Sequence, residues 1–403
     1  MTPLRVPLGR AIARLLTSDR RQRIQRRLYT LRRRLAGSAP VVHYFHQYDD
    51  PYSQLAATQL ARLESRYRVL LRCHPVPAPD ALAAPQAAAL AAWSLRDATR
   101  QAARFALSSP APVDSPKISF DPIAVRRGGR LRARLGHYLG AMFHFEGEWY
   151  WGLDRLHYLE RRLQAEGLAR DPAPMTATPL FEPPALQWQV APSVSSKPVL
   201  HFFCSLRSPY TWLAVARVRR LAQHYGATLH LAYLLPMVMR GLAVPWNKRR
   251  YILLDSRREA LRLGLPFGDI VDPVGRPTER GLAVLQRAIE LGRGEAFLES
   301  FLRGVFAEGI DAGSASGLAT LAERAGLGPR DVADALGSEH WRAIAERHRE
   351  ALLASGLWGV PSFRVEGFPA LWGQDRLWMV EEDLLAARQQ SDAAGGASGE
   401  QAP

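Results

Sequence analysis

The sequence predicts an α/β protein of two tandem, related domains, the second of which carries a helical insertion. Three observations predict this class. The chain has 403 residues, more than one domain usually holds. A strand, turn and helix start at Val199 to Ala214 is repeated at Val41 to Ala56, and a late aromatic motif follows each copy. A stretch rich in Pro, Ala, Ser and Thr lies between the copies and is typical of a linker.

These observations divide the chain into five parts: a basic N-terminal helix, a first domain, the linker, a second domain, and a small, polar, Gly-rich tail expected to be disordered. Their ranges are 1–38, 39–165, 166–197, 198–388 and 389–403. No stretch approaches the roughly 18 apolar residues of a membrane span, so we expect a soluble or peripheral protein. The two cysteines, Cys73 and Cys204, form no disulfide framework and favour a reducing, cytoplasmic location.

The N-terminal part is strongly basic. Residues 1–38 hold eleven arginines and one acidic residue, Asp19, which gives +10 of the net charge of +15. Residues 9–35 predict an amphipathic helix with Leu16, Ile24, Leu28, Leu31 and Leu35 on one side. Three roles stay open: packing on the body of the protein through the leucines, docking on an anionic membrane surface or nucleic acid, and organelle targeting.

In the second domain, a short buried strand at Val199 to Phe203 leads into a helix that opens at Ser208-Pro209. Serine is a favoured N-cap residue, and proline is favoured at the first helical position because its missing N–H would have no partner there. This places a hydroxyl beside free backbone amides at the positive end of a helix. Such a point stabilises an anion, a thiolate included.

Ser208-Pro209-Tyr210-Thr211 stands where a DsbA-like oxidoreductase has Cys-Pro-x-Cys, and without either thiol disulfide exchange is disfavoured. With Gly359-Val360-Pro361-Ser362-Phe363 and Trp372-Gly373-Gln374-Asp375-Arg376-Leu377, this motif resembles the 2-hydroxychromene-2-carboxylate isomerases and the related kappa-class glutathione transferases. The resemblance covers about half the chain well and a further quarter weakly. It implies thioredoxin-like, DsbA-type domains, a cis Pro361, and glutathione as the cofactor.

The resemblance also implies roles for individual residues. Ser208 is the expected catalytic contact to the glutathione sulfur, and Val360 offers backbone to the cysteinyl unit before Pro361. Asn247, Lys248 and Arg249 or Arg250 are expected at the glutathione carboxylates and Asp375 at its amine. The candidates for the substrate pocket are Arg207, Tyr210 and Trp246. Each has a plainer structural alternative: Ser208 as a mere N-cap, residues 248–250 as a solvated face, and Asp375 as a cap of the last helix.

The implied reaction is reversible thiolate addition to an aromatic or conjugated acid, as in an isomerase. A kappa-type transferase and a non-catalytic binding or scaffold protein are the alternatives. Two residues depart from the family pattern: Ser205 stands where many members have an acid, and Arg207 directly precedes Ser208. Cys204 is expected to be a buried, small apolar residue. No His, Cys, Asp or Glu cluster has metal-ligand spacing, so no metal is expected.

Helices are expected between the second and third strands of this domain, at 278–291, 295–306, 314–325, 329–336 and 340–355.

The first domain is expected to be a degenerate copy that has lost the site residues of the second. Asp50-Pro51-Tyr52 stands over Ser208-Pro209-Tyr210, and a carboxylate there disfavours a thiolate by like-charge repulsion. Leu139-Gly140-Ala141-Met142-Phe143 replaces the Val-Pro segment and has no proline. A structural copy with Asp50 as an N-cap is favoured over a separate site. The arginines between 126 and 134 are expected to form a basic loop. The copies can form an internal pseudo-dimer, with a homodimer as the alternative.

Overall fold

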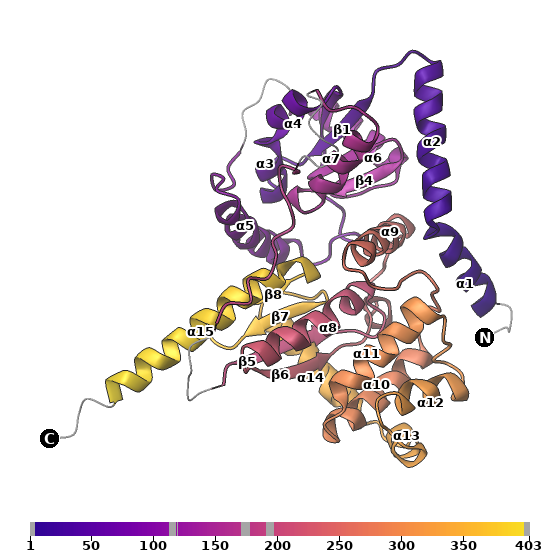
Figure 1. The fold of residues 1–403 in the computed structure, drawn as a ribbon, viewed down its shortest axis with the longest axis vertical. Coiled ribbons are helices and arrows are strands. Elements are labelled where there is room, and N and C mark those ends of the chain that lie inside the picture. Colours follow the sequence, from indigo (N-terminus) through magenta and orange to yellow (C-terminus); the bar gives the residue numbers. More distant parts are fainter. Residues whose placement is uncertain (1–4, 113–117, 119, 171–177, 191–196, 399–403) are drawn as a thin grey trace. The chain divides into compact units, whose positions relative to one another are not determined.

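The structure is a computed structural model that describes residues 5–112, 118, 120–170, 178–190 and 197–398 (Figure 1). Packing divides the chain into two units. The C-terminal unit comprises Met1–Ser18, Ala185–Leu242 and Ile252–Pro403, and the N-terminal unit comprises Asp19–Pro184 and Ala243–Tyr251. Among the described helices, none combines the length and hydropathy that crossing a bilayer requires.

The N-terminal unit contains a four-stranded mixed sheet in the order β2-β1-β3-β4. β1 runs parallel to β2 and antiparallel to β3, and β3 and β4 form a hairpin. Its strands are β1 (Val41–His46), β2 (Leu70–Pro75), β3 (Met142–Phe145) and β4 (Glu148–Trp151). Its helices are α2 (Asp19–Leu35), α3 (Pro51–Ala57), α4 (Leu60–Arg66), α5 (Ala87–Arg104), α6 (Pro122–Leu135) and α7 (Leu156–Ala165), with a 3-10 turn at Leu153–Arg155.

The C-terminal unit repeats this sheet in the order β6-β5-β7-β8, with the same parallel and antiparallel pairs. Its strands are β5 (Val199–Cys204), β6 (Thr228–Tyr233), β7 (Ser362–Val365) and β8 (Leu371–Trp372). Its helices are α1 (Arg5–Leu16), α8 (Pro209–His224), the larger part of α9 (Trp246–Arg262), α10 (Arg276–Glu290), α11 (Gly294–Arg303), α12 (Ala315–Glu323), α13 (Pro329–Leu336), α14 (His340–Ala354) and α15 (Leu377–Ser398). Short helical turns lie at Met237–Arg240, Gly304–Glu308 and Gln374–Arg376.

The two sheets correspond residue by residue. Phe45 of β1 lies opposite Met142, and Phe203 of β5 lies opposite Ser362. The N–H of Gly152 donates to the carbonyl of Ala141 at 2.8 Å, just as the N–H of Gly373 donates to the carbonyl of Pro361 at 2.9 Å. These pairings place Ala141 at the position of Pro361, as the sequence comparison of the two copies predicts.

The α/β class is confirmed, and the predicted helical insertion is present as α10 to α14. Pro329–Leu336 has the predicted bounds. Ser314 is the N-cap of α12, because its hydroxyl accepts the N–H of Gly317 at 2.9 Å. Glu339 holds the N-cap position of α14, without a capping hydrogen bond from its side chain.

Three local expectations are wrong. The single helix expected at 9–35 is two helices, α1 and α2, separated at Thr17 and Ser18. The arginines between 126 and 134 lie on helix α6, not in a loop, because Asp121 accepts the N–H groups of Ile123 and Ala124 and so caps this helix. Helix α15 continues to Ser398, into the tail expected to be disordered; residues 399–403 lie outside the described residues.

The described part of the linker, residues 178–190, is attached to both units. Phe181 is buried in the core of the N-terminal unit, and the N–H of Leu180 donates to Glu160 at 2.8 Å. Further along, the N–H groups of Gln187 and Trp188 both donate to the carboxylate of Glu381 at 2.7 Å. The linker therefore changes from one unit to the other between Phe181 and Gln187.

Candidate active site at the start of helix α8

The candidate site begins at Ser208, the N-cap of α8. The backbone of Ser208 is extended, and Pro209 follows at the first helical position. The Oγ of Ser208 accepts the N–H of Thr211 at 3.2 Å and lies 3.4 Å from the carbonyl oxygen of Val360. A hydroxyl has one donor and two acceptor lone pairs, so an N-cap bond leaves one lone pair for a further donor. The capping role is thus present, and it does not exclude a ligand at the same oxygen.

The Val360 segment lies against this helix start. The Val360–Pro361 peptide bond is cis, as the resemblance implies. Val360 is half-buried, and among the described residues its N–H donates to no backbone carbonyl. Gly359 lets the segment pack under the indole of Trp372, since a Cβ at 359 would lie 2.0 Å from its Cζ2. The site thus offers one hydroxyl and one free backbone N–H side by side.

The two pocket candidates next to Ser208 bond within the protein. Arg207 forms a two-pronged ion pair with Asp272, at 2.6 and 2.7 Å. The hydroxyl of Tyr210 donates to the buried carboxylate of Asp255 at 2.8 Å. Both side chains are half-buried, and their predicted contact with a substrate stays a prediction.

Asp375 belongs to a polar network between α8, α9 and the turn before α15. Its carboxylate accepts the side-chain amide of Gln374, which also donates to Glu259 at 2.9 Å. Arg217 of α8 donates to the side-chain oxygen of Gln374 at 2.7 Å, and burial lowers the pKa of Arg217 to about 10. Asp375 is half-buried, and its predicted role toward an amine stays a prediction.

The five other predicted residues, 246–250, belong to the N-terminal unit, whereas Ser208, Val360 and Asp375 belong to the C-terminal unit. The ammonium of Lys248 donates to the carbonyl of Ala83 at 2.7 Å, and burial lowers its pKa. Arg249 donates to the carbonyl of Val244 at 2.8 Å, and the Oδ1 of Asn247 accepts the N–H of Lys248 at 2.9 Å. Trp246 is 62% exposed. Their place in a glutathione pocket stays a prediction.

The corresponding place in the N-terminal unit is filled by its own side chains. Asp50 caps α3, with its Oδ2 at 3.0 Å from the N–H of Ser53 and at 2.6 Å from its hydroxyl. Burial raises the pKa of Asp50 to about 6. The Oγ of Ser53 in turn accepts the N–H of Ala141 at 2.7 Å. A Cβ on Gly140 would lie 2.7 Å from Gln47 and 3.0 Å from Asp50, so no space is left there.

Ser53 is a residue that the sequence analysis did not single out. Its signal was present: the third residue after the N-cap is a hydroxyl residue in both copies, Ser53 in one and Thr211 in the other. In both units this hydroxyl accepts an N–H group from the turn before the helix, that of Gln47 at 3.2 Å and that of Ser205 at 3.5 Å. Only Ser53 also accepts the N–H of Ala141, because Pro361, at the corresponding position, has no N–H. The same position thus closes one site and not the other.

The described residues include neither an exposed, reactive thiol nor a group of side chains that could bind a metal ion. Cys204 is fully buried at the end of β5, and burial raises the pKa of its thiol well above the usual value. Cys73 is half-buried, and neither cysteine is in a disulfide bond. Within the described ranges, no group of three His, Cys, Asp or Glu side chains can hold a metal ion.

Residues 199–385 match the family of DSBA-like thioredoxin domains, and the match leaves the N-terminal half unassigned. Two curated relatives are the 2-hydroxychromene-2-carboxylate isomerases of Pseudomonas putida (27% identical; 48% of this chain and 98% of the relative) and of Pseudomonas sp. strain C18 (26%; 47% and 91%). A solved 2-hydroxychromene-2-carboxylate isomerase is 24% identical with a TM-score of 0.41, over 48% of this chain and 98% of that one. The cytosolic disulfide reductase DsbM of Pseudomonas aeruginosa, solved with GSH, is 22% identical with a TM-score of 0.39, over the same shares.

Proposed function

We propose that this protein is a glutathione-dependent isomerase of an aromatic or conjugated acid. The premise is that residues 199–385 are a DSBA-like thioredoxin domain distantly similar to 2-hydroxychromene-2-carboxylate isomerases. One observation carries the proposal. Ser208, and not a cysteine, begins α8, and its hydroxyl lies 3.4 Å from the carbonyl of Val360 before Pro361. A site of this form can bind a thiol that comes from outside the chain.

The residues present fit a thiol-bearing tripeptide. The free N–H of Val360 can pair with an extended peptide in the manner of an added strand. The hydroxyl of Ser208 and the first amides of α8 favour the charged form of a nearby thiol and so lower its pKa. When bound, glutathione supplies a nucleophile for reversible addition to a conjugated carbon. The protein itself holds that sulfur at the helix start and orients the substrate.

We further propose that the N-terminal unit is a second, degenerate thioredoxin-like copy with a structural role. Its support is the shared strand order and the closure of its site by Asp50 and Ser53. The two copies then form an internal pseudo-dimer. A mass in solution well above 44.8 kDa would contradict this part of the proposal. Two cysteines without a disulfide bond fit a reducing, cytoplasmic location.

Calorimetric titration of the full chain with glutathione tests the proposal. We expect binding in the wild type and at least about tenfold weaker binding in Ser208→Ala, which loses a hydrogen bond worth about 1.4 kcal/mol or more to a charged sulfur. Ser314→Ala is the matched control, because Ser314 caps α12 in the same way. Both variants should lose about 1 kcal/mol of stability. Only Ser208→Ala should lose affinity for glutathione.

Turnover assays separate the related activities. Glutathione-dependent isomerisation of chromene-type acids, reduced in Ser208→Ala and not in Ser314→Ala, supports the isomerase. Conjugation of simple electrophiles without isomerisation indicates a kappa-type transferase. No binding at millimolar glutathione contradicts both activities and indicates a non-catalytic protein that keeps the fold.

A further inference from the structure

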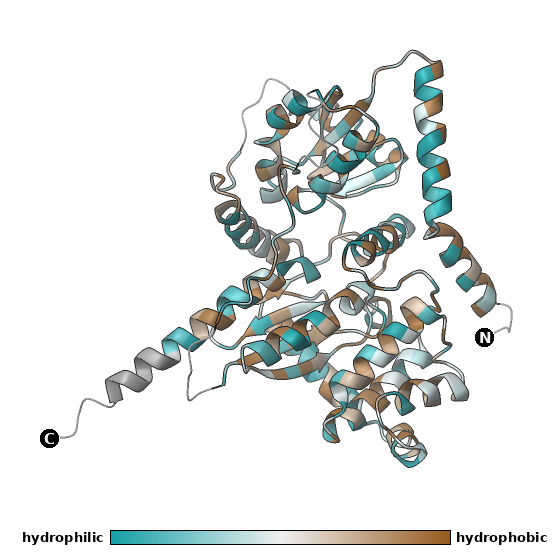
Figure 2. Cartoon of the chain, in the orientation of Figure 1, coloured by the Kyte–Doolittle hydropathy of each residue, from teal (hydrophilic) through white to brown (hydrophobic). Residues whose placement is uncertain are grey.

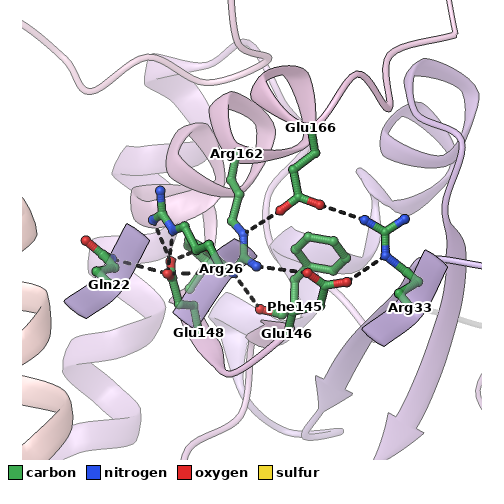
Figure 3. Close-up of polar contacts among 9 residues, drawn as sticks. Gln22, Arg26, Arg33, Phe145, Glu146, Glu148, Arg162 and Glu166 are labelled. Carbon is green, nitrogen blue, oxygen red and sulfur yellow. Dashed lines mark hydrogen bonds and ion pairs between the residues drawn. The ribbon is translucent and has the colours of Figure 1, made fainter. Parts of the chain in front are cut away.

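Helix α2 packs on the N-terminal unit through its polar face. Arg26 forms a two-pronged ion pair with Glu148 at 2.7 and 2.8 Å, and Gln22 donates to the same carboxylate at 3.2 Å. About two helical turns further on, Arg33 donates to Glu146 at 2.7 Å and to Glu166 at 2.8 Å. Figure 3 shows these side chains around the buried Arg162. Residues 22, 26 and 33 share one side of a helix with 3.6 residues per turn.

The apolar face of α2 consequently points to solvent. Ile24, Leu28, Leu31 and Leu35 are spaced by four, three and four residues, so they form one stripe opposite the docked side. Their side chains are 48%, 48%, 53% and 79% exposed. Figure 2 shows hydrophobic (brown) segments recurring along the otherwise hydrophilic helix α2. A surface helix normally buries such a stripe, so an exposed one indicates a missing partner.

Helix α1 shows the same reversal on the C-terminal unit. Arg10 and Arg14 both bind the carboxylate of Asp269, at 2.6 and 2.9 Å for two of the four contacts. Leu8, Ile12 and Leu15 on this helix are 62%, 46% and 58% exposed. Arginines turned inward and leucines turned outward thus occur twice, on two helices held by separate acidic residues.

The charges that border the apolar stripe of α2 indicate which kind of partner it can bind. Exposed arginines border it on both sides: Arg20, Arg23, Arg27 and Arg34 on one, Arg21 and Arg32 on the other. The four-three-four spacing is also that of a coiled coil. In a parallel pairing with a second copy, Arg20, Arg27, Arg34 and Arg32 would occupy the flanking e and g positions and repel one another. A second copy of the chain is therefore disfavoured as the partner of α2. The partner must offer both an apolar interior and a negatively charged surface.

We propose that α2 is a membrane-surface helix that inserts Ile24, Leu28, Leu31 and Leu35 into the interface of an anionic bilayer while the bordering arginines bind its phosphates. An anionic bilayer offers acyl chains below a plane of negative charge, which matches a central apolar stripe with cations on both borders. Nucleic acid matches the arginines alone and leaves the leucines in water. The inward ion pairs with Glu146, Glu148 and Glu166 hold the helix in the orientation that presents this stripe.

Cosedimentation of the full chain with vesicles tests the proposal. We expect binding to phosphatidylserine–phosphatidylcholine vesicles and at least about tenfold weaker binding to pure phosphatidylcholine, because cationic side chains contribute only with anionic lipid. The double variant Leu28→Gln, Leu31→Gln should weaken binding to anionic vesicles at least about tenfold, since it removes two inserted side chains. The matched control is Leu95→Gln, Leu261→Gln, because these leucines are 50% and 51% exposed on other helices. The control should bind like the wild type.

Four outcomes would overturn the proposal: no binding to either vesicle, equal binding to both, an unchanged affinity in the Leu28, Leu31 variant, or an equal loss in the Leu95, Leu261 control. A dimer of the wild type that becomes a monomer in the Leu28, Leu31 variant would assign the stripe to a second copy instead. Circular dichroism and thermal unfolding of each variant check that the fold is kept. The exposure of all four leucines leads us to expect no change in either.

Discussion

At the scale of single residues, Gly359 fixes the geometry beside Ser208. A Cβ at 359 would lie 2.0 Å from Cζ2 and 2.3 Å from Cε2 of Trp372, distances that no carbon pair tolerates without movement. Trp372 is also held by Trp358, whose ring centroid lies 5.1 Å away. The indole therefore cannot give way without disturbing a second aromatic ring.

We predict that Gly359→Ala lowers the free energy of unfolding of the C-terminal unit by about 1–3 kcal/mol, the usual cost of overpacking. Urea denaturation followed by circular dichroism measures it. Gly337→Ala is the control, because the nearest atoms to a Cβ there are 3.6 and 3.7 Å away. Equal stability of both variants would show that Trp372 moves freely.

Single-residue roles were predictable only where a motif carried them. The approach of Ser208 to Val360 followed from the order of the motifs in the second domain. The pairing of Arg207 with Asp272, 65 residues away, and of Lys248 with Ala83, 165 residues away, followed from no local pattern. A long cationic side chain can meet many acceptors, and only the fold selects one.

At the scale of elements, the buried charge cluster under α2 determines how this helix is held. Arg162 is buried and donates to Glu146 at 3.0 Å, to Glu166 at 3.2 Å and to the carbonyl of Phe145 at 2.9 Å. One arginine cannot neutralise three neighbouring carboxylates, the third being Glu148 at 3.6 Å. The remaining positive charges come from Arg26 and Arg33 of α2.

We predict that Arg33→Gln loosens α2 by about 1.5–3 kcal/mol, because it leaves Glu146 and Glu166 with less charge compensation. The readout is hydrogen exchange of the α2 amides, which should become faster by about tenfold or more. Arg34→Gln is the control, since Arg34 is the next residue on the same helix and is exposed. Equally fast exchange in both variants would contradict the role of the cluster.

The sequence favoured the opposite face of this helix. Leucines at helical spacing normally mark the side that packs on a core, and packing through the leucines was one of the three roles left open. The acidic partners that reverse the helix lie on the β3–β4 hairpin and at the end of α7, more than a hundred residues away. Periodicity within a helix reveals its two faces, but not which face finds a partner.

At the scale of the whole molecule, the two units bury separate hydrophobic cores. The α/β class, the order of elements and the repeat were predictable because they rest on motifs and periodic patterns. The assignment of residues 243–251 to the N-terminal unit was not. It rests on contacts such as that between the rings of Tyr251 and His137, whose centroids lie 4.6 Å apart. No local sequence pattern predicts such a contact.

The N-terminal unit contains six of the eleven histidines, among them His46, His74 and His144. Burial is the main cause that lowers the pKa of His46 and of His74 to about 4 and of His144 to about 3. In the unfolded chain these groups titrate near the ordinary value of about 6.5. Below that pH the unfolded state therefore binds protons that the folded unit does not.

We predict that the contribution of these buried histidines to the stability of the N-terminal unit is complete above about pH 6.5 and is lost as the pH falls toward about 4, where they take up protons in the folded state too. Asp50 opposes this loss, because its pKa of about 6 lets the folded unit bind a proton that the unfolded chain does not. His46 has no exposed surface and contributes on the order of 2–3 kcal/mol to this loss. Urea denaturation at about pH 7 and about pH 5 measures it. His46→Gln should lose less stability between these two conditions than the wild type, whereas His340→Gln, at an exposed position of α14, should lose as much. An identical pH dependence of His46→Gln and wild type would show that the acid sensitivity comes from other groups, because only the ionisable ring at 46 distinguishes them.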